Sequence, residues 1–143
     1  MSRINNLVTS KRPIGFWIKS ADQALDRMGD AIHESDGFTR RRWQVLSLIV
    51  RSEPVSIDAL VEQFRPMLGV GEVQAELSVL EDRKIIHYHA GGVSTTTTGA
   101  DIHRHLEARQ ITVREKAMQG IDEADYLATL RCLSRIVENL SED

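Results

Sequence analysis

The sequence is poor in the residue types on which disulfide-bonded, zinc-binding and membrane-spanning proteins depend. It has one cysteine, Cys132, so neither an internal disulfide nor a cysteine-rich zinc site can form within the chain. No apolar run approaches the roughly 18 residues that a transmembrane helix needs. The N-terminus also lacks the charged, apolar and small-residue regions of a signal peptide. We therefore expect a cytoplasmic protein with no membrane partner.

Recognisable catalytic groupings are also missing. The sequence has no serine–histidine–aspartate grouping, no glycine loop suited to phosphate and no paired-carboxylate signature. His87 and His89 could share an ion from one face of a strand, whereas His103 and His105 would point to nearly opposite sides of a helix. No cysteine or carboxylate stands at ligand spacing around them. We therefore expect no enzyme, no metal and no cofactor.

The bulk composition is typical of one globular domain. Of 143 residues, 41% are hydrophobic and 27% are charged, and the net charge is −3. This length supports one core but not two. A negative balance is mildly unfavourable for nucleic acid, because neutralising phosphates needs a basic surface. A locally basic face on an acidic chain would still be compatible with DNA binding.

The most regular part of the sequence, residues 38–98, begins with three helical patterns. Thr39 can cap a first helix, a second begins at Ser56, and a third spans residues 71–81. Their apolar positions recur at helical spacing, so each helix can turn one face toward a common core.

A hairpin pattern follows these helices. Residues 85–89 are rich in β-branched and aromatic side chains, residues 90–92 form a turn, and residues 93–97 are the returning strand. Thr98 is expected to cap the next helix. Three helices and a hairpin predict a mainly α winged helix-turn-helix with a small β-wing. That arrangement usually places its third helix in the DNA major groove.

Long helical patterns flank this region, at residues 14–34 and 99–141, with Asp122 expected to cap the last helix. The flanking helices carry more apolar positions than packing against one small domain requires. Two-fold pairing would bury them and give a homodimer. We treat residues 1–143 as a single domain, with a loose arm over residues 1–13. The residues expected at the dimer contact are Leu127, Leu130, Leu133, Ile136 and Leu140.

Four short motifs occur in a fixed order. They are Thr39-x-x-x-Trp43-x-Val45-Leu46, Val79-Leu80-Glu81 followed by Ile85-Ile86, Thr-Thr-x-Gly99 before a long helix, and Gly120-Ile-Asp-Glu-Ala-Asp125 before the last helix. Their order over residues 16–140 resembles the MarR family of bacterial transcription regulators. The resemblance implies a ligand-responsive repressor that binds a pseudo-palindromic operator in double-stranded DNA. It also implies a dimer formed by the first, fifth and sixth helices.

The third helix carries the candidates for base recognition. Gln74 can bond the N6 and N7 atoms of adenine, and Ala75 can contact a thymine methyl group. The resemblance implies a basic residue near Ala75, so guanine recognition by arginine is expected to be lost. Acidic residues outnumber basic ones between residues 69 and 84, which is unusual for a helix near phosphates. The candidate DNA contacts on this helix are Gly71, Glu72, Gln74, Ala75 and Ser78.

Phosphate contacts are expected from two other places. One is the basic run Arg40, Arg41 and Arg42 at the start of the first helix, which could otherwise be a solvated first turn that the helix dipole disfavours. The other is the hairpin. The resemblance implies a longer wing whose arginine enters the minor groove, but residues 90–94 contain no arginine. The candidates left on the wing are His87, His89, Ser94 and Thr95.

The resemblance also implies a site for a small aromatic or phenolic effector where the dimerisation helices meet the winged region. The alternative role for both tryptophans in this set is plain core packing. The matching positions are Trp17, Ala21, His33, Trp43 and Leu46.

Two other functions fit the same fold. One is a winged-helix protein-interaction module that has lost DNA binding, which the acidic third helix and short wing support. The other is a metal- or thiol-responsive regulator. A redox role would need Cys132 exposed beside a basic neighbour such as Arg131 or Arg135, whereas a buried Cys132 would be an inert hydrophobic residue.

Overall fold

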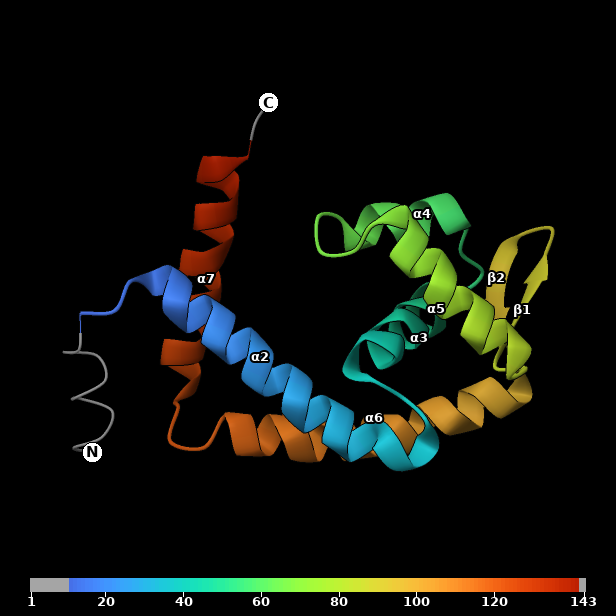
Figure 1. Cartoon of the computed structure of the whole chain (residues 1–143), viewed down its shortest axis with the longest axis horizontal. Coiled ribbons are helices and arrows are strands. Elements are labelled where there is room, and N and C mark those ends of the chain that lie inside the picture. Colours follow the sequence, from blue (N-terminus) through green and yellow to red (C-terminus); the bar gives the residue numbers. More distant parts are fainter. Residues whose placement is uncertain (1–10, 142–143) are drawn as a thin grey trace.

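The computed structural model describes residues 11–141, and most of the expected N-terminal arm lies outside them. Among these residues are six α-helices, a short 3-10 helix and one two-stranded antiparallel sheet (Figure 1). The winged helix-turn-helix with flanking helices is confirmed. In chain order the elements are α2 (Ile14–His33), η1 (Glu34–Asp36), α3 (Arg40–Ser52), α4 (Ile57–Phe64), α5 (Val70–Asp82), β1 (Ile86–His89), β2 (Gly92–Thr95), α6 (Thr97–Ala117) and α7 (Glu123–Leu140).

The hydrophobic core lies in the winged region, where α3, α4 and α5 pack together with the hairpin. On α5, Val73, Leu77 and Leu80 are at most 1% exposed, as their helical spacing predicted. They meet Leu46 and Leu60 of the neighbouring helices. Burying each leucine-sized side chain stabilises the fold by roughly 1.5–3 kcal/mol. Because α5 buries this face, its opposite face is left to solvent.

Of the three predicted caps, Thr39 and Asp122 are confirmed and Thr98 is wrong, while Ser56, predicted as the start of the second helix, caps it. The side chains of Thr39, Ser56 and Asp122 each accept a hydrogen bond from a backbone N–H of the first turn. The prediction that Thr98 caps the long helix is wrong, because Thr96 caps it by accepting from the Gly99 N–H at 3.0 Å. The Thr96 hydroxyl also donates to the Lys84 carbonyl at 2.7 Å. This contact with the start of the hairpin fixes the cap two residues earlier.

The flanking helices are arranged differently from the winged region (Figure 1). Helix α2 packs along α6, and both contact α3. Helix α7 leaves the end of α6 that is far from the wing and has no buried residue. Within residues 11–141, no helix combines the length and hydrophobicity needed to cross a membrane.

Candidate functional site

The outward face of α5 is the first candidate surface. Helical geometry turns this face away from the core, because α5 is anchored by its three buried apolar residues. The structure places all five predicted base-contact residues in solvent, namely Gly71, Glu72, Gln74, Ala75 and Ser78. All but Glu72 carry no charge, and the side chains of Gln74, Ala75 and Ser78 could meet the neutral edges of bases.

Arg40 does not belong to a free basic patch. Its guanidinium donates to Asp26 at 2.8 Å and to Asp22 at 3.4 Å, and its backbone N–H donates to Asp30 at 2.8 Å. All three acids lie on α2, and the Arg40 side chain is only 19% exposed. The expectation of a phosphate contact at Arg40 is therefore corrected, because this residue joins the start of α3 to α2.

Arg41 and Arg42 both pair with acids on α5. Arg42 Nε donates to Glu76 at 2.7 Å in a pair whose side chains are 19% and 16% exposed. Arg41 donates to Glu72 at 2.9 Å, and both of these side chains are about half exposed. Exposed pairs of this kind contribute roughly 0–1 kcal/mol, so a phosphate could replace Glu72 as the partner of Arg41 at little cost. Of the three arginines, only Arg41 remains a candidate phosphate contact.

These pairs account for two of the acids on the third helix, Glu72 and Glu76, whose presence the sequence left unexplained. Glu72 also accepts from the Gly69 N–H at 3.4 Å, so its carboxylate caps α5 as well as pairing with Arg41. The spacing of Glu72 and Glu76 by one helical turn was the available signal. Finding their partners requires the packing of α3 against α5, which the sequence alone does not give.

The wing residues mostly bond to one another or to the loop before α4. His89 Nδ1 accepts from the Gly91 N–H at 3.1 Å, which leaves Nε2 as donor to the Ser94 hydroxyl at 2.7 Å. The Thr95 N–H and hydroxyl both donate to the Glu53 carboxylate, at 2.8 and 2.6 Å. These three side chains already have partners within the chain, and their contact with phosphate stays a prediction.

His87 stays exposed on the outer side of β1. Its ring centroid lies 5.2 Å from that of His89. Between residues 11 and 141, no third histidine, cysteine or carboxylate joins this pair to make a metal-binding group. His87 is therefore the wing side chain best placed to meet an incoming phosphate.

A cavity of about 670 Å³ lies between α3 and α6, and Phe64, Met67 and Tyr126 also line it. Of the five residues predicted for an effector pocket, only Trp43 lines it. Leu46 lies in the core, and Ala21 is exposed on α2.

The other two predicted pocket residues also lie outside the cavity. Trp17 contacts Phe16 edge to face near the start of α2, far from where that helix meets α3. His33 is fully buried behind Trp43, with stacked rings 5.9 Å apart, and its Nε2 donates to the Gln110 side chain at 3.1 Å. The expected pocket is thus corrected to one centred on α3 and α6, to which α2 contributes Leu25.

Polar groups that were not predicted for the effector pocket line this cavity. Ser47 and His103 share a hydrogen bond of 3.2 Å, and each is only 8% exposed. Arg51 and Arg114 line the same cavity, and the Trp43 indole nitrogen has no hydrogen-bond partner among the described residues. An apolar cavity with a few such groups can orient a small molecule.

Burial of His103 predicts a pH dependence of stability. Desolvation lowers its pKa below the ordinary value of about 6.5, and Arg51 lowers it further against the opposing effect of Glu107. A depressed pKa favours the neutral ring in the folded state. The stability from this group is therefore present above about pH 6.5 and lost as the pH falls through the folded pKa.

We expect the free energy of unfolding to decrease between pH 7 and pH 5, and His103→Gln to flatten that decrease. Urea titrations at several pH values measure it, with His105→Gln on the exposed side of α6 as the matched control. Equal slopes for the two variants would contradict the prediction.

Neither the protein-family models nor the curated proteins contain a match to this sequence. Solved structures do match it. The reduced form of MarR from E. coli is 21% identical, covers 92% of this chain and 98% of its own, and superposes with a TM-score of 0.73. A MarR-family protein of Mycobacterium tuberculosis, solved in complex with DNA, is 16% identical, with 88% and 98% covered and a TM-score of 0.71.

A third similar structure is BpsR of Bordetella bronchiseptica, whose DNA binding is regulated by 6-hydroxynicotinic acid. It is 14% identical, covers 93% of this chain and 97% of its own, and has a TM-score of 0.76. At such low identity the likeness concerns the fold, and it extends over nearly the full length of each partner. The chain therefore has the winged-helix fold of the MarR family of transcription regulators, as the resemblance in its sequence implied.

Proposed function

We propose that this chain is a DNA-binding transcription regulator that places α5 in the major groove of duplex DNA. The observation that carries the proposal is the outward face of α5. Gln74, Ala75 and Ser78 are exposed there, while the acids Glu72 and Glu76 are paired with arginines of α3. Pairing reduces the repulsion that phosphates would otherwise meet. It also weakens the case for a protein-interaction module, which depended on an acidic third helix.

The proposed regulator acts as a homodimer. Residues 38–98 form its DNA-binding unit, and residues 14–34 and 99–141 supply the dimerisation helices. Support comes from α7, where Leu127, Leu130 and Leu140 are 43%, 45% and 78% exposed in the single chain. An isologous pair of such helices would bury these side chains. The dimer then presents two α5 helices to half-sites about one DNA turn apart, as a pseudo-palindromic operator requires.

A small aromatic effector is proposed for the cavity between α3 and α6. Its volume of about 670 Å³ falls within the roughly 300–1,000 Å³ of typical ligand pockets. Trp43 lines the cavity and offers it an apolar aromatic surface. The regulation of BpsR by a small heteroaromatic acid supports an effector of this size. In this proposal the protein represses a promoter, and binding of the effector releases it from the DNA.

Two substitutions on the proposed interface test DNA binding with different signatures. Gln74→Ala should relax the preference at one A·T base pair by roughly 1–3 kcal/mol, because it removes a bidentate contact to adenine. Arg41→Gln should weaken binding to all duplexes alike and reduce the salt slope by about one unit. Fluorescence anisotropy over a series of salt concentrations, on selected genomic fragments, measures both.

The control is Arg27→Gln, which removes an exposed charge from α2, away from α5. Its DNA affinity should equal that of the wild type. If Gln74→Ala and Arg41→Gln also leave every affinity unchanged, the outward face of α5 is not the DNA interface. A wild-type chain that binds no duplex at low salt would favour the protein-interaction alternative.

A further inference from the structure

In the loop that joins α2 to α3, two backbone carbonyls accept hydrogen bonds from arginine side chains. Gly37 has φ of +71°, a left-handed conformation that glycine adopts without strain. The Gly37 N–H donates to the Glu34 carbonyl at 2.9 Å, and the Phe38 N–H donates to the His33 carbonyl at 3.1 Å. These bonds end the helical segment and turn the carbonyl oxygens of Asp36 and Gly37 toward α5.

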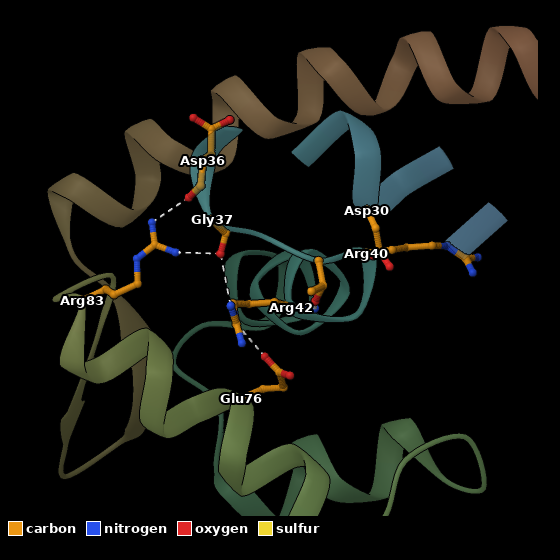
Figure 2. Close-up of polar contacts among 8 residues, drawn as sticks. Asp30, Asp36, Gly37, Arg40, Arg42, Glu76 and Arg83 are labelled. Atoms are coloured by element: carbon orange, nitrogen blue, oxygen red, sulfur yellow. Dashed lines mark hydrogen bonds and ion pairs between the residues drawn. The ribbon is translucent and has the colours of Figure 1, made fainter. Parts of the chain in front are cut away.

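Arg83, the residue that ends α5, binds both of these carbonyls (Figure 2). Its Nη2 donates to the Asp36 carbonyl at 2.8 Å, and its Nη1 donates to the Gly37 carbonyl at 3.1 Å. Its guanidinium also lies 5.0 Å from the centroid of the Phe38 ring. A planar guanidinium can direct two N–H groups at two neighbouring acceptors, which gives the contact a defined geometry.

A second arginine connects α5 to the same loop. Arg42 Nη1 donates to the Gly37 carbonyl at 3.1 Å, while its Nε donates to Glu76 at 2.7 Å (Figure 2). Helix α5 is thus attached to the loop at two points about two helical turns apart, through Glu76 and through Arg83 itself. Its other packing contacts are with α3, α4 and β1.

A third arginine attaches the loop to the long helix α6. The Arg109 guanidinium pairs with the Asp36 carboxylate and donates to the Ser35 hydroxyl at 2.6 Å. The Asp36 side chain is therefore occupied by α6, while its carbonyl is occupied by α5. The short segment from Ser35 to Gly37 is consequently the place where both flanking helices, α2 and α6, contact the end of α5.

We infer that Arg83 is a positioning residue that fixes the orientation of α5 relative to α2 and α6. The consequence of this positioning, a defined spacing of two α5 helices on DNA, rests on the proposed function. A 13-residue helix is about 20 Å long. A rotation of about 10° at its Arg83 end would move the other end by about 3.4 Å, which is the rise of one base pair. A small loosening of this contact is therefore enough to change which spacing of half-sites fits.

The first test needs no DNA. Spin labels are attached at Ser78→Cys on α5 and Gln23→Cys on α2, in a Cys132→Ser background. Double electron–electron resonance then measures the distribution of distances between the two labels, which reports the orientation of α5. Diluting labelled chains into excess unlabelled chains restricts the signal to one chain. Arg83→Gln should at least double the width of the distance distribution. A matched control, Lys84→Gln, removes the neighbouring positive charge and should leave the distribution as in the wild type.

Arg83→Lys separates position from charge and is the variant to use if Arg83→Gln does not fold. An ammonium group keeps the charge but lacks the planar pair of donors, so the distribution should widen again. Distributions of Arg83→Gln, or of Arg83→Lys in its place, that coincide with those of the wild type and of Lys84→Gln would overturn the inference.

The second test measures spacing on DNA. The wild-type chain should prefer half-site centres about ten base pairs apart over the same half-sites with two base pairs inserted. Arg83→Gln should reduce that preference at least tenfold, whereas Lys84→Gln should weaken both complexes alike. Equal preferences for the two variants would overturn the role of Arg83 in spacing. If the wild type binds no duplex while the label distances still respond to Arg83, the DNA-binding proposal fails and the positioning inference stands.

Discussion

Replacing Leu130 by aspartate is expected to convert the protein from a dimer to a monomer while the winged region stays folded. In the single chain this side chain is 45% exposed, and α7 contributes no buried residue to the core. The substitution should therefore cost little within one chain. In a dimer it would bury a carboxylate without a partner, at a cost of several kcal/mol. Sedimentation velocity at micromolar concentration measures the change.

A matched control lies on the opposite side of the same helix. At 100° per residue, Ala128 points about 160° away from Leu130, and it is exposed among polar neighbours. Ala128→Asp adds the same charge on the side of α7 that faces away from the proposed contact, so it should leave the dimer intact. A wild-type chain that sediments as a monomer would refute the dimer. If both variants dissociate equally, the dimer contact is not made specifically by the apolar stripe of α7. That stripe comprises Leu127, Leu130, Leu133, Ile136 and Leu140.

Replacing Gly99 by alanine is expected to destabilise the fold by about 3 kcal/mol, near the upper end of the usual range for overpacking. Gly99 is buried in the first turn of α6, and an added Cβ would lie 2.0 Å from the Ile85 carbonyl oxygen. That carbonyl accepts from the Thr96 N–H at 3.0 Å, so relief of the clash would break a contact between hairpin and helix. The melting temperature should fall by about 10 °C.

Gly15 provides the control for this substitution. It also lies in the first turn of a long helix, α2, but nothing stands within 4 Å of its added Cβ. Gly15→Ala should therefore be neutral or stabilising by up to about 1 kcal/mol. Thermal unfolding followed by circular dichroism compares the two variants. A melting temperature for Gly99→Ala within 2 °C of the wild type would show that α6 can shift without loss.

Local patterns in the sequence predicted most of the fold, because apolar spacing and helix capping involve residues that are close together in the chain. Apolar spacing identified the buried face of α5, and side-chain caps at Thr39, Ser56 and Asp122 located three helix starts. The cap of α6 was misplaced within the run of threonines at residues 95–98. All four have the same chemistry, so only the contact of Thr96 with the hairpin distinguishes it.

The candidate site was harder to predict, since its electrostatics depend on which helices pack together. Arg40 and Arg42 looked like available charges, but the acids that neutralise them lie more than ten residues away in the sequence. The exposed face of α5 followed from periodicity and was predicted residue by residue. The cavity was not, because the buried contact between Ser47 and His103 depends on how α3 packs against α6.

The unburied face of α7 separates the folding of one chain from the assembly of two. The buried hydrophobic residues all lie within residues 38–113 of the described part of the chain, so a chain can collapse before it meets a second copy. In the proposed dimer, subunits can then exchange without unfolding, and dimer abundance follows mass action. At low expression, where monomers predominate, occupancy of a paired DNA site should rise with the square of the chain concentration. The amount of protein would thereby act as a second control over the promoter, alongside any effector.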